Sequence, residues 1–175
     1  MLSKFLFSRF TREAGSKNRD PAEARVELGR TYQRTGQIQK AIKSYLSALE
    51  LNPNLVIAYT SLGVAYDQLG DFVKALRVYT KAIMLAPHES ELRNDLGLAY
   101  FNIGSYAEAI KAFRQALVLD PDNARAHYCL GLVYLDLNDT EMALAELSQL
   151  KVRNEKELAF QLLDQIQRQS SQQAS

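Results

Sequence analysis

The chain has 175 residues, of which 47% are hydrophobic and 23% charged, and its net charge is only +1. This composition predicts one soluble domain and lacks the basic excess of a nucleic-acid-binding protein, so we expect no nucleic-acid partner. The single cysteine, Cys129, excludes an intramolecular disulfide and fits a reducing, cytoplasmic compartment. No apolar run in the sequence approaches the roughly 20 residues that cross a bilayer.

Residues 1–20 differ from the rest of the chain. Five bases against two acids give them a net charge of +3, and residues 5–10 include three phenylalanines. One interpretation is a disordered tail whose apolar residues fold back on the chain. A second is that residues 1–12 form an amphipathic anchor for an anionic membrane surface, or a docking segment for a neighbouring subunit. A targeting peptide is the third, although the apolar run Phe5–Phe7 is too short for a secretory signal.

A motif recurs every 34 residues, in residues 22–55, 56–89, 90–123 and 124–157. It combines a Leu-Gly pair, two aromatic residues, a second glycine, two alanines and a proline at fixed offsets. In the second copy these residues are Leu62, Gly63, Tyr66, Gly70, Ala75, Tyr79, Ala82 and Pro87. A fixed period of this length indicates a repeat array, and four copies exceed the roughly three that such an array needs.

Each copy contains two segments whose apolar residues recur at helical spacing, which predicts helix pairs over residues 22–51, 56–85, 90–119 and 124–153. Asp20 and Pro21 predict the cap and the first turn of the first helix. Between the two helices of the second copy, Gly70 predicts a left-handed helix end and Asp71 the next cap.

The third and fourth copies vary these helix boundaries. Ser105 and Glu108 predict a capping box before the second helix of the third copy. Asn138 replaces the second glycine in the fourth copy, and asparagine is the residue that next best tolerates a positive φ.

Small residues in the motif predict close contact within each pair. We expect Gly63 and Ala75 to let the two helices approach while Tyr66 and Tyr79 fill the space beside them, and we expect Ala75 and Ala109 to be fully buried. Residues 155–169 predict one further helix, which covers the apolar end of the array. Residues 170–175 are rich in serine and glutamine and are expected to be a disordered tail.

These residues, at these offsets, resemble the tetratricopeptide repeat (TPR) family over residues 22–157, within a predicted repeat domain of residues 21–169. The resemblance implies an all-α fold, a right-handed α-solenoid of antiparallel helix pairs, and a role as a scaffold or adaptor. The chain departs from the family at its early tryptophan position, which is filled by Arg25, Tyr59, Arg93 and His127.

The sequence offers little that could carry catalysis. It has no Gly-rich phosphate loop, nucleophile elbow or HExxH motif. His88, His127 and Cys129 lack a third ligand at metal-binding spacing. We therefore expect no enzyme activity, no cofactor and no metal.

The family resemblance implies a concave groove lined by the first helix of each pair. In the first copy the groove-facing positions are Glu23, Val26, Glu27, Arg30 and Gln33. The candidate peptide-binding residues of the other copies are Ile57, Thr60, Val64, Glu91, Asn94, Asp95, Leu98, Phe101, Tyr128, Leu132 and Leu135. Acids stand at Glu91 and Asp95, where chaperone-binding members of the family use bases, so a carboxylate clamp is excluded.

The candidate groove is polar at its first copy and becomes apolar toward its fourth. A helix or extended peptide with aromatic anchors and flanking bases would suit it. The sequence thus predicts a non-catalytic module that binds a protein or peptide. One alternative is a self-assembling homo-oligomer in which residues 1–12 occupy a neighbour's groove. Another is a peripheral membrane adaptor anchored by the same residues.

Overall fold

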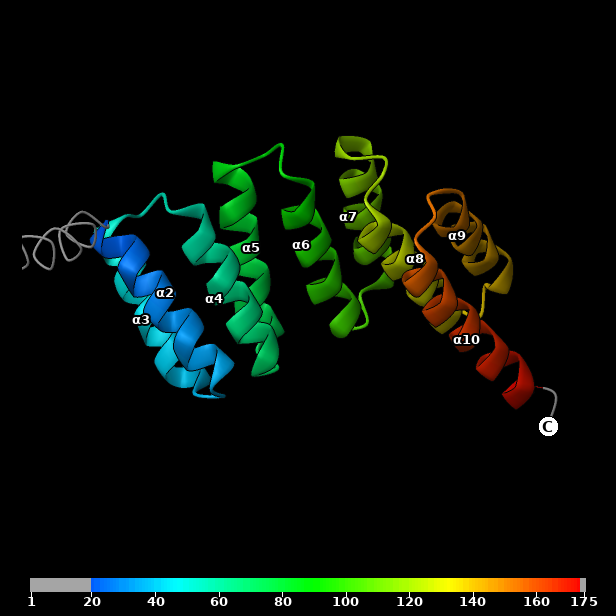
Figure 1. The fold of residues 1–175 in the computed structure, drawn as a ribbon, viewed down its shortest axis with the longest axis horizontal. Coiled ribbons are helices and arrows are strands. Elements are labelled where there is room, and N and C mark those ends of the chain that lie inside the picture. The colour runs from blue at the N-terminus through cyan, green and yellow to red at the C-terminus, as the bar shows by residue number, and fades with distance from the viewer. Residues whose placement is uncertain (1–19, 174–175) are drawn as a thin grey trace, which may run out of the picture. The chain divides into compact units, whose positions relative to one another are not determined.

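The structure is a computed structural model that describes residues 20–173. Every regular element in that range is a helix, and the helices follow one another along the chain (Figure 1). They are α2 (Pro21–Arg34), α3 (Ile38–Leu51), α4 (Val56–Gln68), α5 (Phe72–Leu85), α6 (Ser90–Asn102), α7 (Tyr106–Leu119), α8 (Ala124–Asp136), α9 (Thr140–Val152) and α10 (Lys156–Gln173). The tail, anchor, docking and targeting interpretations of residues 1–12 lie outside the described residues.

The helices form successive antiparallel pairs, α2 with α3, α4 with α5, α6 with α7 and α8 with α9 (Figure 1). The predicted all-α fold and the four predicted pairs are confirmed, and the helix ends agree to within a residue. Among residues 20–173, no helix combines the length and apolar character needed to cross a membrane.

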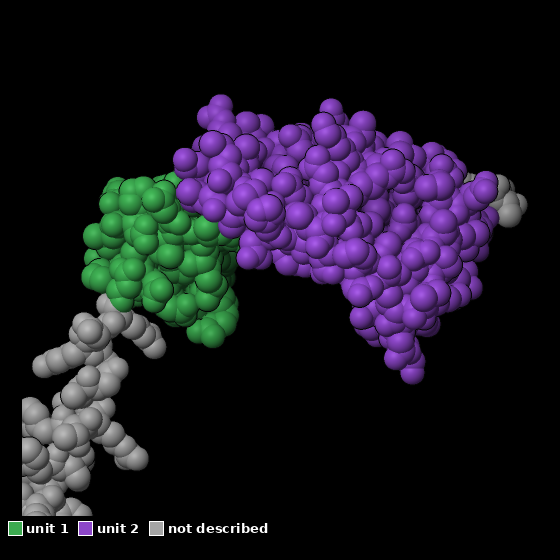
Figure 2. Space-filling view, turned by 90° about the horizontal axis from the view of Figure 1, so that it is seen from above, with its two compact units in different colours: residues 1–62 green, residues 63–175 purple. Residues whose placement is uncertain are grey.

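The chain divides into two compact units, Met1–Leu62 and Gly63–Ser175, with the boundary inside α4 (Figure 2). The sequence predicted one repeat domain over residues 21–169. Because each repeat contacts mainly its neighbours, contacts in such an array are local along the chain, and the array can divide into more than one compact unit. In the first unit Ala22, Ala41 and Tyr45 are fully buried. The core of the second unit is larger and includes residues from α7, α8, α9 and α10.

Glycine lets the two helices of a pair approach closely, as predicted. A Cβ atom placed on Gly63 would lie 2.4 Å from the ring of Tyr79, and one on Gly97 would lie 2.6 Å from Phe113. Both distances are far below van der Waals contact, so only glycine fits there. In the last pair, a Cβ atom placed on Gly131 would lie 2.5 Å from the side chain of Leu162 of α10. The added helix therefore supplies part of the packing.

The turns within the pairs take the predicted conformations. Gly70 has φ +73° and Gly104 has φ +74°, and Asn138 adopts φ 59° in the glycine position of the fourth repeat. Asp20 accepts a hydrogen bond from the backbone N–H of Ala22, and Asp71 accepts one from that of Lys74.

The capping box predicted at Ser105 and Glu108 is wrong. Ser105 makes no side-chain cap hydrogen bond at the start of α7. Its backbone N–H donates to the carbonyl of Tyr100 at 2.9 Å, which closes the turn at the end of α6. That N–H is therefore engaged and cannot receive the return bond from Glu108 that a capping box requires.

The additional helix α10 was predicted over residues 155–169 but runs from Lys156 to Gln173. The expectation of a disordered tail is therefore wrong for residues 170–173. The hydroxyls of Ser170 and Ser171 donate to the carbonyls of Ile166 and Gln167, both at 2.9 Å, so these serines satisfy their hydroxyls inside the helix. Gln169 also anchors the helix, because its side-chain amide donates to the carbonyl of Leu135 at 2.8 Å.

Candidate functional site

The predicted groove residues lie on the first helices α4, α6 and α8 and differ widely in accessibility. Ile57 and Glu91 are exposed, Thr60, Val64, Leu98, Phe101, Tyr128 and Leu132 are half-buried, and Asn94, Asp95 and Leu135 are buried. Ile57 and Thr60 belong to the first unit and the others to the second.

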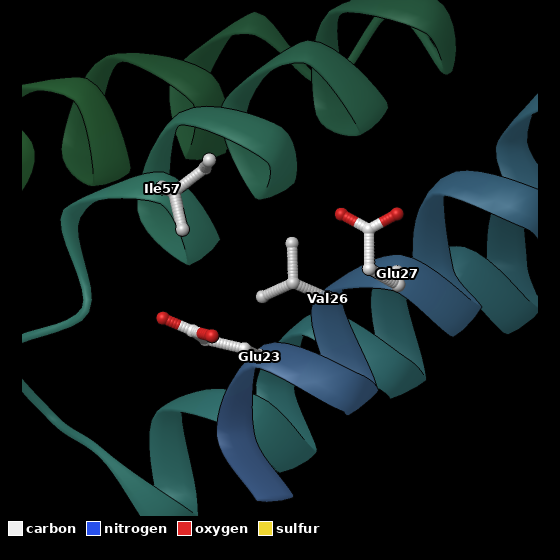
Figure 3. A pocket seen from close by; sticks show the side chains of 4 residues that line it. All are labelled: Glu23, Val26, Glu27 and Ile57. Atoms are coloured by element: carbon white, nitrogen blue, oxygen red, sulfur yellow. The ribbon is translucent and has the colours of Figure 1, made fainter. Parts of the chain in front are cut away.

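A hollow in the first unit is lined by Glu23, Val26 and Glu27 of α2 and by Ile57 of α4, and its volume is about 290 Å³. All four residues stand at positions that the sequence predicted to face the groove. In Figure 3 the side chain of Val26 points toward Ile57, with the carboxylates of Glu23 and Glu27 on either side. Val26 is buried whereas Ile57 is 42% exposed. We call this site the acidic hollow.

The acidic hollow arises from the spacing of residues on one helix. Glu23, Val26 and Glu27 stand three and four residues apart, so they share one face of α2. Glu27 forms an exposed ion pair with Arg30, 2.9 Å between Oε1 and Nη1. Glu23 makes no ion pair among residues 20–173 and is exposed. The hollow therefore combines an apolar floor with the carboxylate of Glu23, which no cation of the described residues pairs with.

In the second unit, Arg125 of α8 binds two acids of α6. Its Nη1 atom lies 3.2 Å from Oε2 of Glu91 and 3.1 Å from Oδ1 of Asp95. The side-chain amide of Asn123 donates to Glu91 at 2.9 Å. We expected Glu91 and Asp95 to meet bases from a ligand, and in the structure a base of the same chain is already there. A ligand's base would have to compete with Arg125.

The second unit also contains buried polar atoms on α4 and α6. The hydroxyl of Tyr79 donates to Oδ2 of Asp67 at 2.7 Å, while the other oxygen of Asp67 is buried without a partner among the described residues. Asn94 is completely buried, and neither its oxygen nor its nitrogen has a partner there. Burial raises the pKa of Asp67 despite the hydrogen bond from Tyr79, and it raises the pKa of Asp95 despite the nearby Arg125.

The sequence predicts a contiguous apolar strip along the groove, with two or three of its residues packed under a neighbouring helix; the strip consists of Val64, Leu98, Phe101, Tyr128, Leu132 and Leu135. Leu98, Phe101, Tyr128 and Leu132 all pack against the hydrophobic cluster of the second unit, and Leu135 belongs to that cluster. The ring of Phe101 also contacts that of Tyr106, with centroids 6.0 Å apart. Five of the six strip residues therefore contact the core, and only Leu135 among them is buried, so the strip keeps part of its apolar surface accessible.

Of the three residues considered for metal binding, His127 and Cys129 are buried and His88 is exposed. Burial raises the pKa of the Cys129 thiol to about 12, and such a thiol is a poor nucleophile. His127 lies with Nδ1 2.7 Å from Oε2 of Glu146. Within residues 20–173, no three histidine, cysteine or acidic side chains come together in a way that could hold a metal ion.

Sequence reasoning named the acids of this surface but missed the pairing of Arg125 with them. A signal was present, because Glu91 and Arg125 are separated by one repeat period of 34 residues. Equivalent residues of consecutive first helices lie side by side, and α6 and α8 contact each other. Opposite charges at the same repeat position therefore predict an ion pair.

Comparison with protein families agrees with this geometry. The family described as "TPR repeat" matches residues 29–70 and 97–138, and "Tetratricopeptide repeat" matches residues 56–89. The chain belongs to the tetratricopeptide repeat family. Repeats of this family generally mediate protein–protein interactions and are typically non-catalytic. No curated protein matches this chain.

Solved structures of MamA are similar to this TPR chain. One is 25% identical, with a TM-score of 0.71, and the match covers 83% of this chain and 85% of that one. A second MamA structure is 26% identical with a TM-score of 0.69, covering 78% and 75%. MamA from Desulfovibrio magneticus RS-1 is 23% identical with a TM-score of 0.71, covering 85% and 84%, and that likeness concerns the fold alone.

Proposed function

We propose that this chain is a non-catalytic adaptor that binds a peptide or helix of a partner protein on its first helices, with the acidic hollow as the main contact. The hollow carries the proposal because it brings four residues from predicted groove positions together around one accessible space. Membership of a family whose repeats generally bind proteins supports the same function.

The proposal is tested by two matched substitutions. Ile57 lines the hollow on α4, whereas Leu46 lies on the second helix α3, and both side chains are 42% exposed. We expect the full chain to capture specific proteins from its source cells, and Ile57→Glu to lose them while Leu46→Glu retains them. Circular dichroism checks that both variants fold. Equal capture by both variants, or loss with Leu46→Glu alone, would place the contact elsewhere.

Self-assembly is the second candidate, favoured by charge. Residues 1–12 carry three bases and three phenylalanines, which complement the carboxylates and apolar floor of the hollow. In that case the full chain is an oligomer, and removal of residues 1–18 makes it a monomer. Light scattering after size-exclusion chromatography measures this directly. A full chain that stays monomeric at high concentration rules out self-assembly and leaves the adaptor proposal standing.

A further inference from the structure

The acidic hollow and the Arg125 ion pair occupy equivalent positions two repeats apart. Glu23 and Glu27 correspond to Glu91 and Asp95, each 68 residues further along the chain. Both pairs are spaced four residues apart on a first helix. The residue that faces the acid pair from the first helix of the following repeat differs between the two units. It is Arg125 in the second unit, and Ile57 stands at the equivalent position in the first.

The second unit shows what an acid pair at these positions binds. The guanidinium of Arg125 contacts both acids through one nitrogen, at 3.2 and 3.1 Å. In the first unit the same helix face presents two carboxylates and a hollow of about 290 Å³, and no cation of the next first helix enters it. We infer that the acidic hollow receives an arginine side chain of the partner protein, which takes the place that Arg125 has in the second unit. This inference rests on the proposed function and specifies its ligand.

The shape and chemistry of the hollow suit that side chain. Arginine has an apolar stem and a charged head, which match the Val26 and Ile57 side chains and the flanking carboxylates. Like charges four residues apart on a helix repel each other, and a bound cation relieves that repulsion. The volume of about 290 Å³ lies just below the range of small-molecule sites, about 300 to 1,000 Å³, so the hollow fits one side chain better than a cofactor.

Arg30 is the internal competitor. It pairs with Glu27 at 2.9 Å on the surface, where its side chain is about half exposed. An exposed pair of this kind contributes little, so an incoming arginine can displace it. Removing Arg30 should therefore strengthen binding, whereas removing Glu23 should weaken it. A purely structural role for these residues does not predict opposite effects on binding.

The probe is a phage-displayed library of random 12-residue peptides, selected on the full chain. Clones that bind wild type but not Ile57→Glu identify ligands of the hollow. We expect them to be enriched in arginine, and one is synthesised with its arginine replaced by citrulline, a neutral side chain of nearly the same shape. Fluorescence anisotropy should show about fivefold weaker binding of the citrulline peptide, the upper end for an exposed ion pair.

The variants make this result specific. The citrulline penalty should vanish in the double variant Glu23→Gln/Glu27→Gln and persist in Glu50→Gln, an exposed acid of α3. Ile57→Arg should fill the hollow from within and abolish peptide binding while the chain stays folded. Clones that require Ile57 but bind equally well with citrulline overturn the arginine inference and leave the adaptor proposal intact. A library that yields no Ile57-dependent clone contradicts both.

Discussion

At the scale of single residues, the fold depends on small side chains at fixed repeat positions. Ala75 and Ala109 are completely buried, as the sequence predicted, and glycines let aromatic rings of the second helices lie against the first helices. Protein interiors are close-packed, so added volume at such a contact forces the helices apart.

Enlarging the helix contact should therefore destabilise the chain. We predict that Ala109→Leu lowers the free energy of unfolding by roughly 1–3 kcal/mol through overpacking. Ala107→Leu, two residues away on the exposed face of α7, is the control and should have little effect. Urea denaturation followed by circular dichroism compares the two. An unchanged midpoint for Ala109→Leu would show that the helix-pair contact is misassigned.

The half-buried carboxylate of Asp67 predicts a pH dependence of stability. Burial raises the pKa of this carboxyl in the folded state above the ordinary value of 3.8, which applies to the unfolded state. At a pH between the pKa of the unfolded state and that of the folded state, the folded state therefore binds the proton more tightly. The free energy of unfolding therefore falls as pH rises through that window. Asp67→Asn removes this titration and still accepts the Tyr79 hydroxyl bond.

Denaturation at several pH values tests this sign. Relative to wild type, Asp67→Asn should gain stability as the pH rises from about 4 to 7, above the ordinary pKa of the carboxyl. Glu50→Gln, which replaces an exposed acid, should show the same pH dependence of stability as wild type. A difference between wild type and Asp67→Asn that stays constant with pH contradicts the raised pKa.

The sequence predicted the packing of small residues more accurately than it predicted hydrogen bonds and ion pairs. Glycine and alanine that recur at regular positions have few roles other than close helix packing. The positions of Gly63 and Ala75 in the helix contact could therefore be predicted from the sequence alone. A polar side chain can bind any of several partners, and which one it contacts depends on the residues that lie near it in the folded chain. The capping box predicted at Ser105 is wrong because the backbone N–H of Ser105 already donates to the carbonyl of Tyr100 at the end of α6. The Arg125 pairing was missed because it joins two repeats.

At the scale of helices, the sequence predicted the ends accurately because caps and breakers recur with the repeat. The fourth repeat departs from this pattern at its end. Glu155 stands where the other three repeats have proline, and the preceding residue, Asn154, adopts a left-handed conformation with φ 60° after α9. Asparagine tolerates this conformation, so the residue type carried the signal. The continuation of α10 to Gln173 was missed because serine and glutamine were read as a tail.

Helix α10 covers the apolar end of the last pair. Leu162 is completely buried against Gly131, whereas Phe160 on the same helix is 68% exposed. We predict that Leu162→Ala lowers the free energy of unfolding by about 2–5 kcal/mol, as for other buried leucines. Phe160→Ala removes a larger side chain but should cost far less. Chemical denaturation ranks the two variants, and the reverse order would contradict the capping role.

Removing the whole helix should have a second effect. Without residues 155–175 the last pair exposes an apolar face, because the ends of repeat arrays need polar covers. We predict lower stability together with association that increases with protein concentration. Analytical ultracentrifugation detects it. A truncated chain that is monomeric and as stable as the full chain would show that α10 does not act as a cap.

At the scale of the whole molecule, the repeat period predicted the fold class and the helix order but only part of the candidate site. The period places equivalent residues of neighbouring helices side by side, which suffices for Glu91 and Arg125. It does not say how deeply each side chain is buried. We expected two or three residues of the apolar strip to pack under a neighbouring helix, whereas Leu98, Phe101, Tyr128 and Leu132 all pack against the core and Leu135 belongs to it. The acidic hollow is one accessible part of the predicted surface, and Leu132 and Leu135 line another together with residues of α10.

The most direct test of the central claim locates the bound ligand on the chain. An arginine-containing peptide selected on the full chain is titrated into isotopically labelled protein, and backbone amide signals are followed by NMR. Binding in the acidic hollow predicts shifts concentrated at residues 23–30 and 56–60, with little change around Leu46 of α3. Shifts concentrated on α3, or absent from α2 and the start of α4, would contradict the claim that this hollow is the binding site.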